Sequence, residues 1–157
     1  MRFLLLMSFI ACLSFAASGQ NKVPQFKDFP AGKIYKGKNV PVKLTTADER
    51  MFRTRLREAA KEKPNFAGRY ILTTWGCGTT CLMGAVIDAQ TGKVYWWDFS
   101  ICCWEDVDEN FNPIEFRLDS RLIVFSGLRN EDGTKGAHFY KFENGRFVFI
   151  KTVPDKK

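Results

Sequence analysis

Residues 70–99 read YILTTWGCGTTCLMGAVIDAQTGKVYWWDF, and this stretch decides the fold. Its first two runs, 70–75 and 82–89, are rich in β-branched, aromatic and aliphatic residues, which is typical of strands. The residues Gln-Thr-Gly follow at 90–92, and the glycine suits the positive φ angle of a tight turn. Residues 94–99 then return antiparallel. We therefore expect a β-hairpin at the centre of the domain.

Strand patterns continue from this hairpin toward the C-terminus. Short runs of strand-forming residues occupy 116–118 and 121–126. Two more runs, 137–142 and 146–153, flank the Asn-Gly pair at 144–145, which is the strongest short hairpin signal. Six or more short strands with hairpin-length connections predict one antiparallel, meander-like sheet.

One segment, residues 46–63, carries a helical pattern. Thr46 and Glu49 stand in capping-box positions, in which each side chain bonds the backbone N–H of the other residue. Apolar residues recur at three-and-four spacing along one face (Phe52, Leu56, Ala59 and Ala60), and Pro64 ends the pattern. We therefore expect a mainly β, α+β domain in which a single N-terminal amphipathic helix packs on the sheet.

The N-terminus has the features of a signal peptide. A positive start at Arg2 precedes the apolar residues 3–17, and small residues permit cleavage near Gly19. The apolar run is shorter than the roughly 20 residues of a membrane-spanning helix. We expect residues 1–19 to be removed and the protein to be periplasmic or secreted. Lipid attachment at Cys12 is the alternative.

Two parts follow the signal peptide. Residues 20–44 contain three prolines and scattered lysines, and they predict an extended arm with short edge strands near 33–35 and 42–44. Residues 45–157 are of the size of one domain.

Four cysteines remain after cleavage: Cys77, Cys81, Cys102 and Cys103. An even number of cysteines in a small exported domain predicts a disulfide framework. The expected hairpin register favours Cys81 with Cys103 and Cys77 with Cys102. Local closure of Cys77 with Cys81 is the main competitor. A Cys102–Cys103 bridge is disfavoured because it closes an eight-membered ring.

Several chemical functions can be weighed against this framework. A thiol–disulfide enzyme or a cysteine hydrolase would use Cys77 or Cys81, and the hydrolase would need the one histidine, His138, as its base. Residues 106–112 alternate oxygen ligands as a calcium loop does, but Phe111 stands where that loop needs glycine. We expect no cofactor, no metal and no catalytic residue.

Two surface features are candidate binding sites. A basic stripe lies along the expected helix (Arg50, Arg53, Arg57 and Lys61), where it could bind anions. Tryptophans flank the cysteines and form either core or a recognition patch (Trp75, Trp96, Trp97 and Trp104). With a formal net charge of +7, the chain suits an anionic envelope component or a protein as partner, and we do not expect a nucleic acid.

Three strings carry a resemblance to a known group of proteins: NFAGRY from Asn65, WGCGTTC from Trp75 and IDAQTGKVY from Ile87. They resemble a family of small exported bacterial proteins that has no known activity. The resemblance covers most of the mature chain and implies a bacterial envelope or secreted protein.

Together these features predict an exported, non-enzymatic binding or accessory domain held by two disulfides. The alternative is an envelope thiol–disulfide or cysteine-dependent enzyme that uses Cys77 or Cys81.

Overall fold

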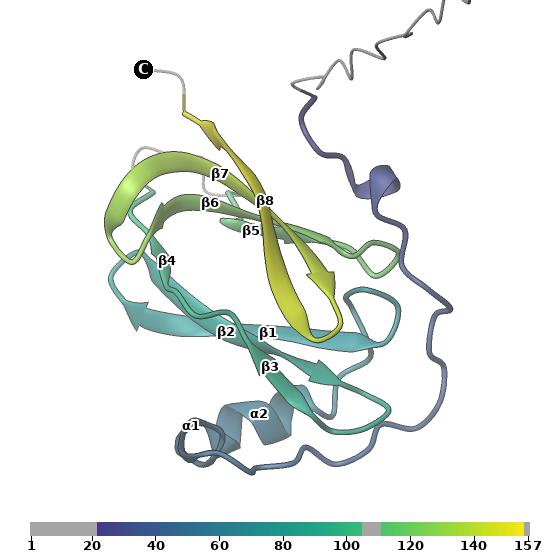
Figure 1. Ribbon diagram of the computed structural model, residues 1–157. Coiled ribbons are helices and arrows are strands. Elements are labelled where there is room, and N and C mark those ends of the chain that lie inside the picture. Colours follow the sequence, from purple (N-terminus) through teal and green to yellow (C-terminus); the bar gives the residue numbers. More distant parts are fainter. Residues whose placement is uncertain (1–21, 105–110, 156–157) are drawn as a thin grey trace, which may run out of the picture.

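The computed structural model describes residues 22–104 and 111–155 (Figure 1). The predicted signal peptide at 1–19, with Cys12, lies outside these residues. Within them, no helix is long and apolar enough to cross a membrane. The elements in order are a 3₁₀ turn at Phe26–Asp28, α1 at Ala47–Met51, α2 at Arg53–Ala59, β1 at Tyr70–Gly78, β2 at Cys81–Asp88, β3 at Val94–Trp96, β4 at Ile101–Cys102, β5 at Ile114–Phe116, β6 at Leu122–Arg129, β7 at Asp132–Glu143 and β8 at Arg146–Pro154.

The described strands form one antiparallel sheet in the order β1-β2-β4-β6-β7-β8, which confirms the mainly β class. Strand β3 pairs only with β2, and β5 pairs only with β6. The short β4 pairs with both neighbours, so it joins the two halves of the sheet. Figure 1 shows β1, β2 and β3 in one layer and β5 to β8 in a second layer above it.

The space between the two layers holds the largest core cluster. It contains buried residues from both layers (Phe66, Leu72, Val86, Trp97, Ile101, Ile114, Ile123, Phe125, Tyr140 and Phe142). Its rings meet at edge-to-face or tilted angles, as Trp97 and Phe125 do with centroids 5.2 Å apart. Strand alternation directs every second residue of β1, β2 and β6 into this space.

The other residues of the same strands face outward and are covered by other segments. Ile71 and Trp75 of β1 and Ile87 of β2 pack against Leu56 of α2. On the second layer, Leu122, Val124 and Phe139 pack against Phe26 and Phe29 of the arm. The helices and the later part of the arm therefore cover one outer face, and the start of the arm covers the other.

The expected single helix is not present: α1 and α2 are separate short helices that meet at Phe52. The backbone of Phe52 leaves helical geometry, with φ −92° and ψ 17°. Its ring lies 5.0 Å from that of Trp75 and 5.7 Å from that of Trp96. The break is consistent with the fit of this ring between two tryptophans, a tertiary contact that three-and-four spacing does not reveal.

The capping box at the start of α1 is confirmed. Glu49 N donates to Thr46 Oγ1 at 3.2 Å, and Glu49 Oε2 accepts from Thr46 N at 2.8 Å. The same carboxylate also accepts from the backbone N–H and, at 2.9 Å, the hydroxyl of Thr45. Burial alone raises the pKa of Glu49, but these hydrogen bonds outweigh it and hold that pKa below its ordinary value.

The arm contains no strand between residues 31 and 46, so the two predicted edge strands are wrong. It is held instead by single backbone hydrogen bonds to successive loops. Tyr35 N donates to Gly68 O at 2.8 Å, and Lys43 N donates to Gly92 O at 2.7 Å. The prolines of the arm lack the backbone N–H that a strand ladder needs.

The hairpin at Asn144-Gly145 is confirmed, with φ angles of 52° and 74° at the two turn residues. A second turn of the same kind lies at Asn130-Glu131, with φ angles of 53° and 61°. It joins β6 to β7, which both extend beyond the runs recognised in the sequence. Glu131 is not a typical residue for a positive φ, so the turn chemistry gave no signal there.

Candidate functional site

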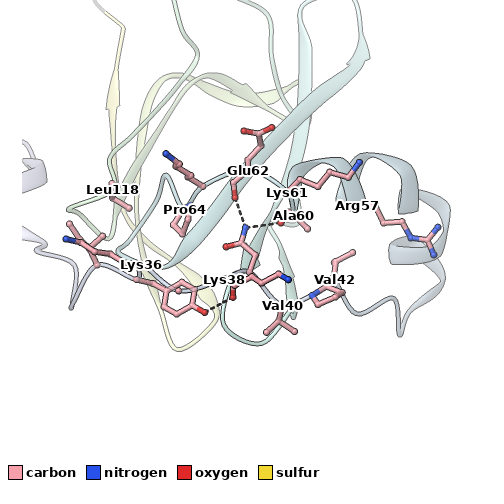
Figure 2. Close-up of a pocket in the computed structure, with 16 residues that line it drawn as sticks. Lys36, Lys38, Val40, Val42, Arg57, Ala60, Lys61, Glu62, Pro64 and Leu118 are labelled. Atoms are coloured by element: carbon pink, nitrogen blue, oxygen red, sulfur yellow. Dashed lines mark hydrogen bonds between the residues drawn. The ribbon is translucent and has the colours of Figure 1, made fainter.

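An open groove lies between the arm and the C-terminal end of α2 (Figure 2). Its volume is about 1080 Å³. We call it the basic groove and define it by its lining residues: Ile34, Tyr35, Lys36, Gly37, Lys38, Asn39, Val40, Pro41, Val42, Arg57, Ala60, Lys61, Glu62, Lys63, Pro64 and Leu118.

Asn39 fixes one wall of the groove to the other. Its Nδ2 donates to Ala60 O at 2.9 Å and to Glu62 O at 2.7 Å (Figure 2). These carbonyls belong to the end of the helical segment, where the backbone has no intrahelical donor. Pro64 prevents the helix from continuing. The arm thereby caps the helix end.

A tight turn within the arm shapes the opposite side of the groove. The hydroxyl of Tyr35 donates to Lys38 O at 2.8 Å. Gly37 lies beneath the ring, where a Cβ would collide with the tyrosine. The ring of Tyr35 is therefore held in a fixed position at the groove.

Cations surround the groove. Five line it (Lys36, Lys38, Arg57, Lys61 and Lys63), against one carboxylate, that of Glu62. Lys61 pairs with Glu58 at 2.8 Å, and the other four have no ion-pair partner among the described residues. Figure 2 shows Lys36 and Arg57 at opposite ends of the groove. The cations therefore outnumber the carboxylates around the groove, which favours an anionic ligand.

The surface between these cations is largely apolar. Aliphatic, proline and aromatic residues supply it (Ile34, Tyr35, Val40, Pro41, Val42, Ala60, Pro64 and Leu118). Ile34 remains 41% exposed, an unusual degree for an isoleucine. A ligand with a hydrocarbon or sugar-ring face and several anionic groups matches this surface.

The structure divides the predicted basic stripe. Arg57 and Lys61 line the groove. Arg50 and Arg53 instead bond the backbone near α1: Arg50 Nη1 donates to Thr45 O at 2.9 Å, and Arg53 Nη1 donates to Arg50 O at 3.2 Å. Arg50 lies in α1, before the break at Phe52, whereas Arg53 begins α2, about one turn before the groove residue Arg57. Lys36, Lys38 and Lys63 were not predicted as site residues, and the scattered lysines of the arm were the only signal for Lys36 and Lys38.

The four tryptophans lie in two different clusters. Trp75 and Trp96 pack in the cluster under the helices, while Trp97 and Trp104 belong to the cluster between the layers. Trp75 and Trp97 are 5% and 4% exposed, so neither offers a recognition surface. Trp96 and Trp97 face opposite sides of the sheet, as their adjacent positions predict. The indole N–H groups of Trp75, Trp96 and Trp97 have no hydrogen-bond partner among the described residues.

The disulfide pairing differs from the one expected. The structure joins Cys77 to Cys81 and Cys102 to Cys103, with Cα separations of 5.2 and 3.8 Å. The favoured pairs, Cys81–Cys103 and Cys77–Cys102, are therefore wrong. The competitor Cys77–Cys81 is present, together with the Cys102–Cys103 bridge that the eight-membered ring was expected to disfavour.

Backbone irregularities explain the difference. The β1–β2 register shifts between Gly76 and Gly78, so Cys77 is an extra residue beside Cys81. On the other side of β2, Cys102 rather than Cys103 lies opposite Cys81. Cys103 has φ 66°, a left-handed conformation, and β4 ends at Cys102. The expected register assumed that the strand after the turn runs without interruption to the cysteines. The structure instead has two separate strands there, β3 and β4, so the expected register does not hold.

His138 occupies a buried structural position. Its Nδ1 lies 2.8 Å from Thr152 Oγ1, and its Nε2 lies 3.0 Å from Gly127 O. Both ring nitrogens thus have partners within the sheet, and all four described cysteines are paired. Residues 22–104 and 111–155 therefore provide neither a free thiolate nor a free imidazole for a cysteine hydrolase.

No group of three potential metal-ligating side chains occurs in the described parts of the chain. Residues 106–112, whose oxygen ligands only partly follow a calcium-loop pattern, lie mostly outside those parts, which resume at Phe111.

No family model matches the chain, and searches of curated proteins and of solved structures find no match.

Proposed function

We propose that the protein is an exported, non-enzymatic binding domain whose basic groove holds an anionic saccharide of the cell envelope. The observation that carries the proposal is the set of groove cations, four of which have no ion-pair partner among the described residues. Unpaired cations around one concave surface attract an anionic ligand and speed its association.

The spacing of the charges favours an extended ligand over a single small ion. Lys36 and Arg57 lie at opposite ends of the groove (Figure 2), with Lys38 and Lys63 elsewhere along its walls. An acidic oligosaccharide presents charges at intervals along its length. Its ring faces can also contact the apolar floor and the fixed ring of Tyr35.

The compartment supports the same ligand class. The sequence predicts export, and disulfides persist in the oxidising compartments that exported proteins reach. The resemblance to small exported bacterial proteins agrees with this location. Bacterial envelopes are rich in acidic polysaccharide, so the proposed ligand and the protein would meet there.

Titration calorimetry with a heparin-derived hexasaccharide, a sulfated probe, tests the proposal. The uncharged maltohexaose is the control ligand. We expect binding of the sulfated probe alone, with an affinity that falls as the salt concentration rises, because exposed charges are screened by salt.

Matched variants locate the binding site. The double variant Lys38→Gln/Arg57→Gln removes two groove cations, and we expect it to weaken binding about tenfold. The control Arg55→Gln/Lys135→Gln removes two exposed cations that do not line the groove, and we expect a change of less than about twofold. Equal losses in both double variants would show non-specific attraction and reject the groove as the site.

A further inference from the structure

The four described cysteines gather at one end of the sheet, although they form two separate local disulfides. Cys77 and Cys81 flank the β1–β2 turn, and Cys81 lies directly opposite Cys102 in the β2–β4 register. The backbone N–H of Cys103 donates to Thr80 O, at 3.1 Å, in the same turn. The two disulfides therefore occupy neighbouring strands at the same level.

Solvent reaches these disulfides unequally. Cys77 is exposed at the hairpin tip and Cys81 is half-buried. Cys102 is only 2% exposed, while Cys103 is half-buried. A reductant from solution can approach Cys77 without moving the sheet. The sulfur of Cys102 is instead accessible mainly to its neighbours in the structure.

We propose that these cysteines form a thiol–disulfide exchange site with two alternative pairings: the observed one and a cross-strand Cys81–Cys102 disulfide. The exchange is started by a dithiol reductant from outside the protein. This inference does not depend on the basic groove.

The reaction has two steps: the dithiol first reduces the Cys77–Cys81 disulfide through two displacements, and the freed Cys81 then exchanges with the second disulfide. One thiolate of the dithiol attacks Cys77 Sγ, breaks the Cys77–Cys81 bond and releases Cys81 as a thiolate. The second thiol of the reductant then displaces Cys77, which leaves as a thiol, and the reductant becomes a disulfide. The Cys81 thiolate attacks Cys102 Sγ and breaks the Cys102–Cys103 bond, whose electron pair leaves on Cys103. The protein gains two electrons and ends with thiols at Cys77 and Cys103.

The register makes the second step feasible. Opposite residues of an antiparallel pair lie on the same face, with Cα atoms roughly 4.5–5.5 Å apart. A disulfide accepts Cα separations of roughly 4.4–6.8 Å. Cys81 can therefore reach Cys102 without moving either strand. Exchange also frees Cys103 from the two-residue ring, so that its backbone can leave φ 66°.

Trypsin separates the two disulfides cleanly. Cleavage after Arg69, Lys93 and Arg117 places Cys77 and Cys81 in peptide 70–93, and Cys102 and Cys103 in peptide 94–117. In the purified, air-oxidised protein we expect the two peptides to be unlinked, each about 2 Da lighter than its reduced form. Linked peptides in this sample would overturn the pairing on which the proposal stands.

The variant Cys77→Ser leaves Cys81 without its partner and tests the exchange. After alkylation and non-reducing digestion, we expect peptides 70–93 and 94–117 to be linked, with the alkyl group on Cys103. The control Cys81→Ser leaves a free thiol at Cys77, and we expect unlinked peptides with Cys77 alkylated. Unlinked peptides in Cys77→Ser with Cys81 alkylated, or a bridge from Cys81 to Cys103, would overturn the proposal.

Wild-type protein gives a second measurement that needs no variant to fold. One equivalent of dithiothreitol, followed by acid quenching, alkylation and digestion, should produce the linked peptides with alkyl groups on Cys77 and Cys103. Alkylation of Cys77 and Cys81 in unlinked peptides would show simple reduction and reject the exchange.

Discussion

His138 Nε2 lies 3.0 Å from the carbonyl oxygen of Gly127, inside the β6–β7 pair. The ring is 1% exposed, and its Nδ1 meets the hydroxyl of Thr152. With a neutral imidazole, Nε2 donates to the carbonyl and Nδ1 accepts from the hydroxyl, so both contacts are satisfied. Burial lowers the pKa of His138 below its ordinary value. The residue thus supports the sheet in its uncharged form.

This relationship predicts how stability depends on pH. The unfolded chain protonates this imidazole below about pH 6.5, whereas the native state holds it neutral to a lower pH. The contribution of the neutral His138 to the free energy of unfolding should therefore be complete above about pH 6.5. It should fall as the pH decreases toward the native pKa, by at most about 1.4 kcal/mol per pH unit. Urea unfolding between pH 7.5 and 5 measures this slope.

The variant His138→Gln is the control for that slope. It keeps a donor and an acceptor but does not titrate, so its stability curve should be flatter over the same interval. Glu49 and Glu143 have lowered pKa values, so the stability that these two carboxylates contribute is lost at more acidic pH. An unchanged slope in the variant would contradict the assignment to His138.

The hydrogen bonds of the Glu49 carboxylate predict that this side chain stabilises the start of α1. It accepts from the backbone N–H groups of Thr45 and Thr46, which otherwise lack intrahelical partners. Glu49→Ala should lower the free energy of unfolding by about 1–2 kcal/mol. Glu58→Ala removes an exposed carboxylate from α2 and should cost less than about 0.5 kcal/mol. Equal losses measured by urea denaturation would contradict the capping role.

Much of the sheet could be predicted from its turns. Asn144-Gly145 and Gly92 specify backbone angles that few other residues adopt, and both turns lie where the sequence places them. The residues that favour a turn lie within the turn itself, so a single sequence is enough to predict it. The turn at Asn130-Glu131 escaped prediction because no glycine marks it.

The candidate site could be predicted only in part. Arg57 and Lys61 lie on one helical segment, and their spacing brings them together in any helix. Lys36 and Lys38 join them because the arm folds back and Asn39 caps the helix end, a contact across 21 residues. The prediction of the cysteine pairing was wrong for a related reason. A one-residue bulge at Cys77 moves its side chain toward a different neighbour, and hydrophobic alternation does not reveal bulges.

The contact between Gly92 and Pro41 predicts how strongly the arm is held against the loop between β2 and β3. It has φ 70°, and a Cβ there would collide with the carbonyl oxygen of Pro41. Gly92→Ala should therefore cost at least about 2 kcal/mol, of which the left-handed backbone explains about 1 kcal/mol. Limited trypsin digestion should cleave faster at Lys38 and Lys43 as the arm separates from the loop.

Gly133 supplies the matched control. It has φ 83°, but a Cβ there would meet nothing within 4 Å. Gly133→Ala should cost only the backbone contribution of about 1 kcal/mol and leave cleavage of the arm unchanged. If the two variants lose equal stability, the contact between Gly92 and the arm contributes nothing to the free energy of unfolding.

The break between α1 and α2 predicts that two adjacent residues differ sharply in their contribution to the free energy of unfolding. The ring of Phe52 packs against Trp75 and Trp96, whereas its neighbour Met51 is 70% exposed. Phe52→Ala should lower the free energy of unfolding by about 3 kcal/mol, because it removes a ring from beneath the helices. Met51→Ala should change it by less than about 0.5 kcal/mol.

Tryptophan fluorescence adds a readout that a general loss of stability would not move. Removal of the Phe52 ring should expose Trp75 and Trp96 to water, so acrylamide quenching of native Phe52→Ala should increase. Trp97 lies in the cluster between the layers and should stay protected. If Phe52→Ala and Met51→Ala match in stability and in quenching, the ring does not fix the helices on the sheet. The break would then follow from the backbone alone.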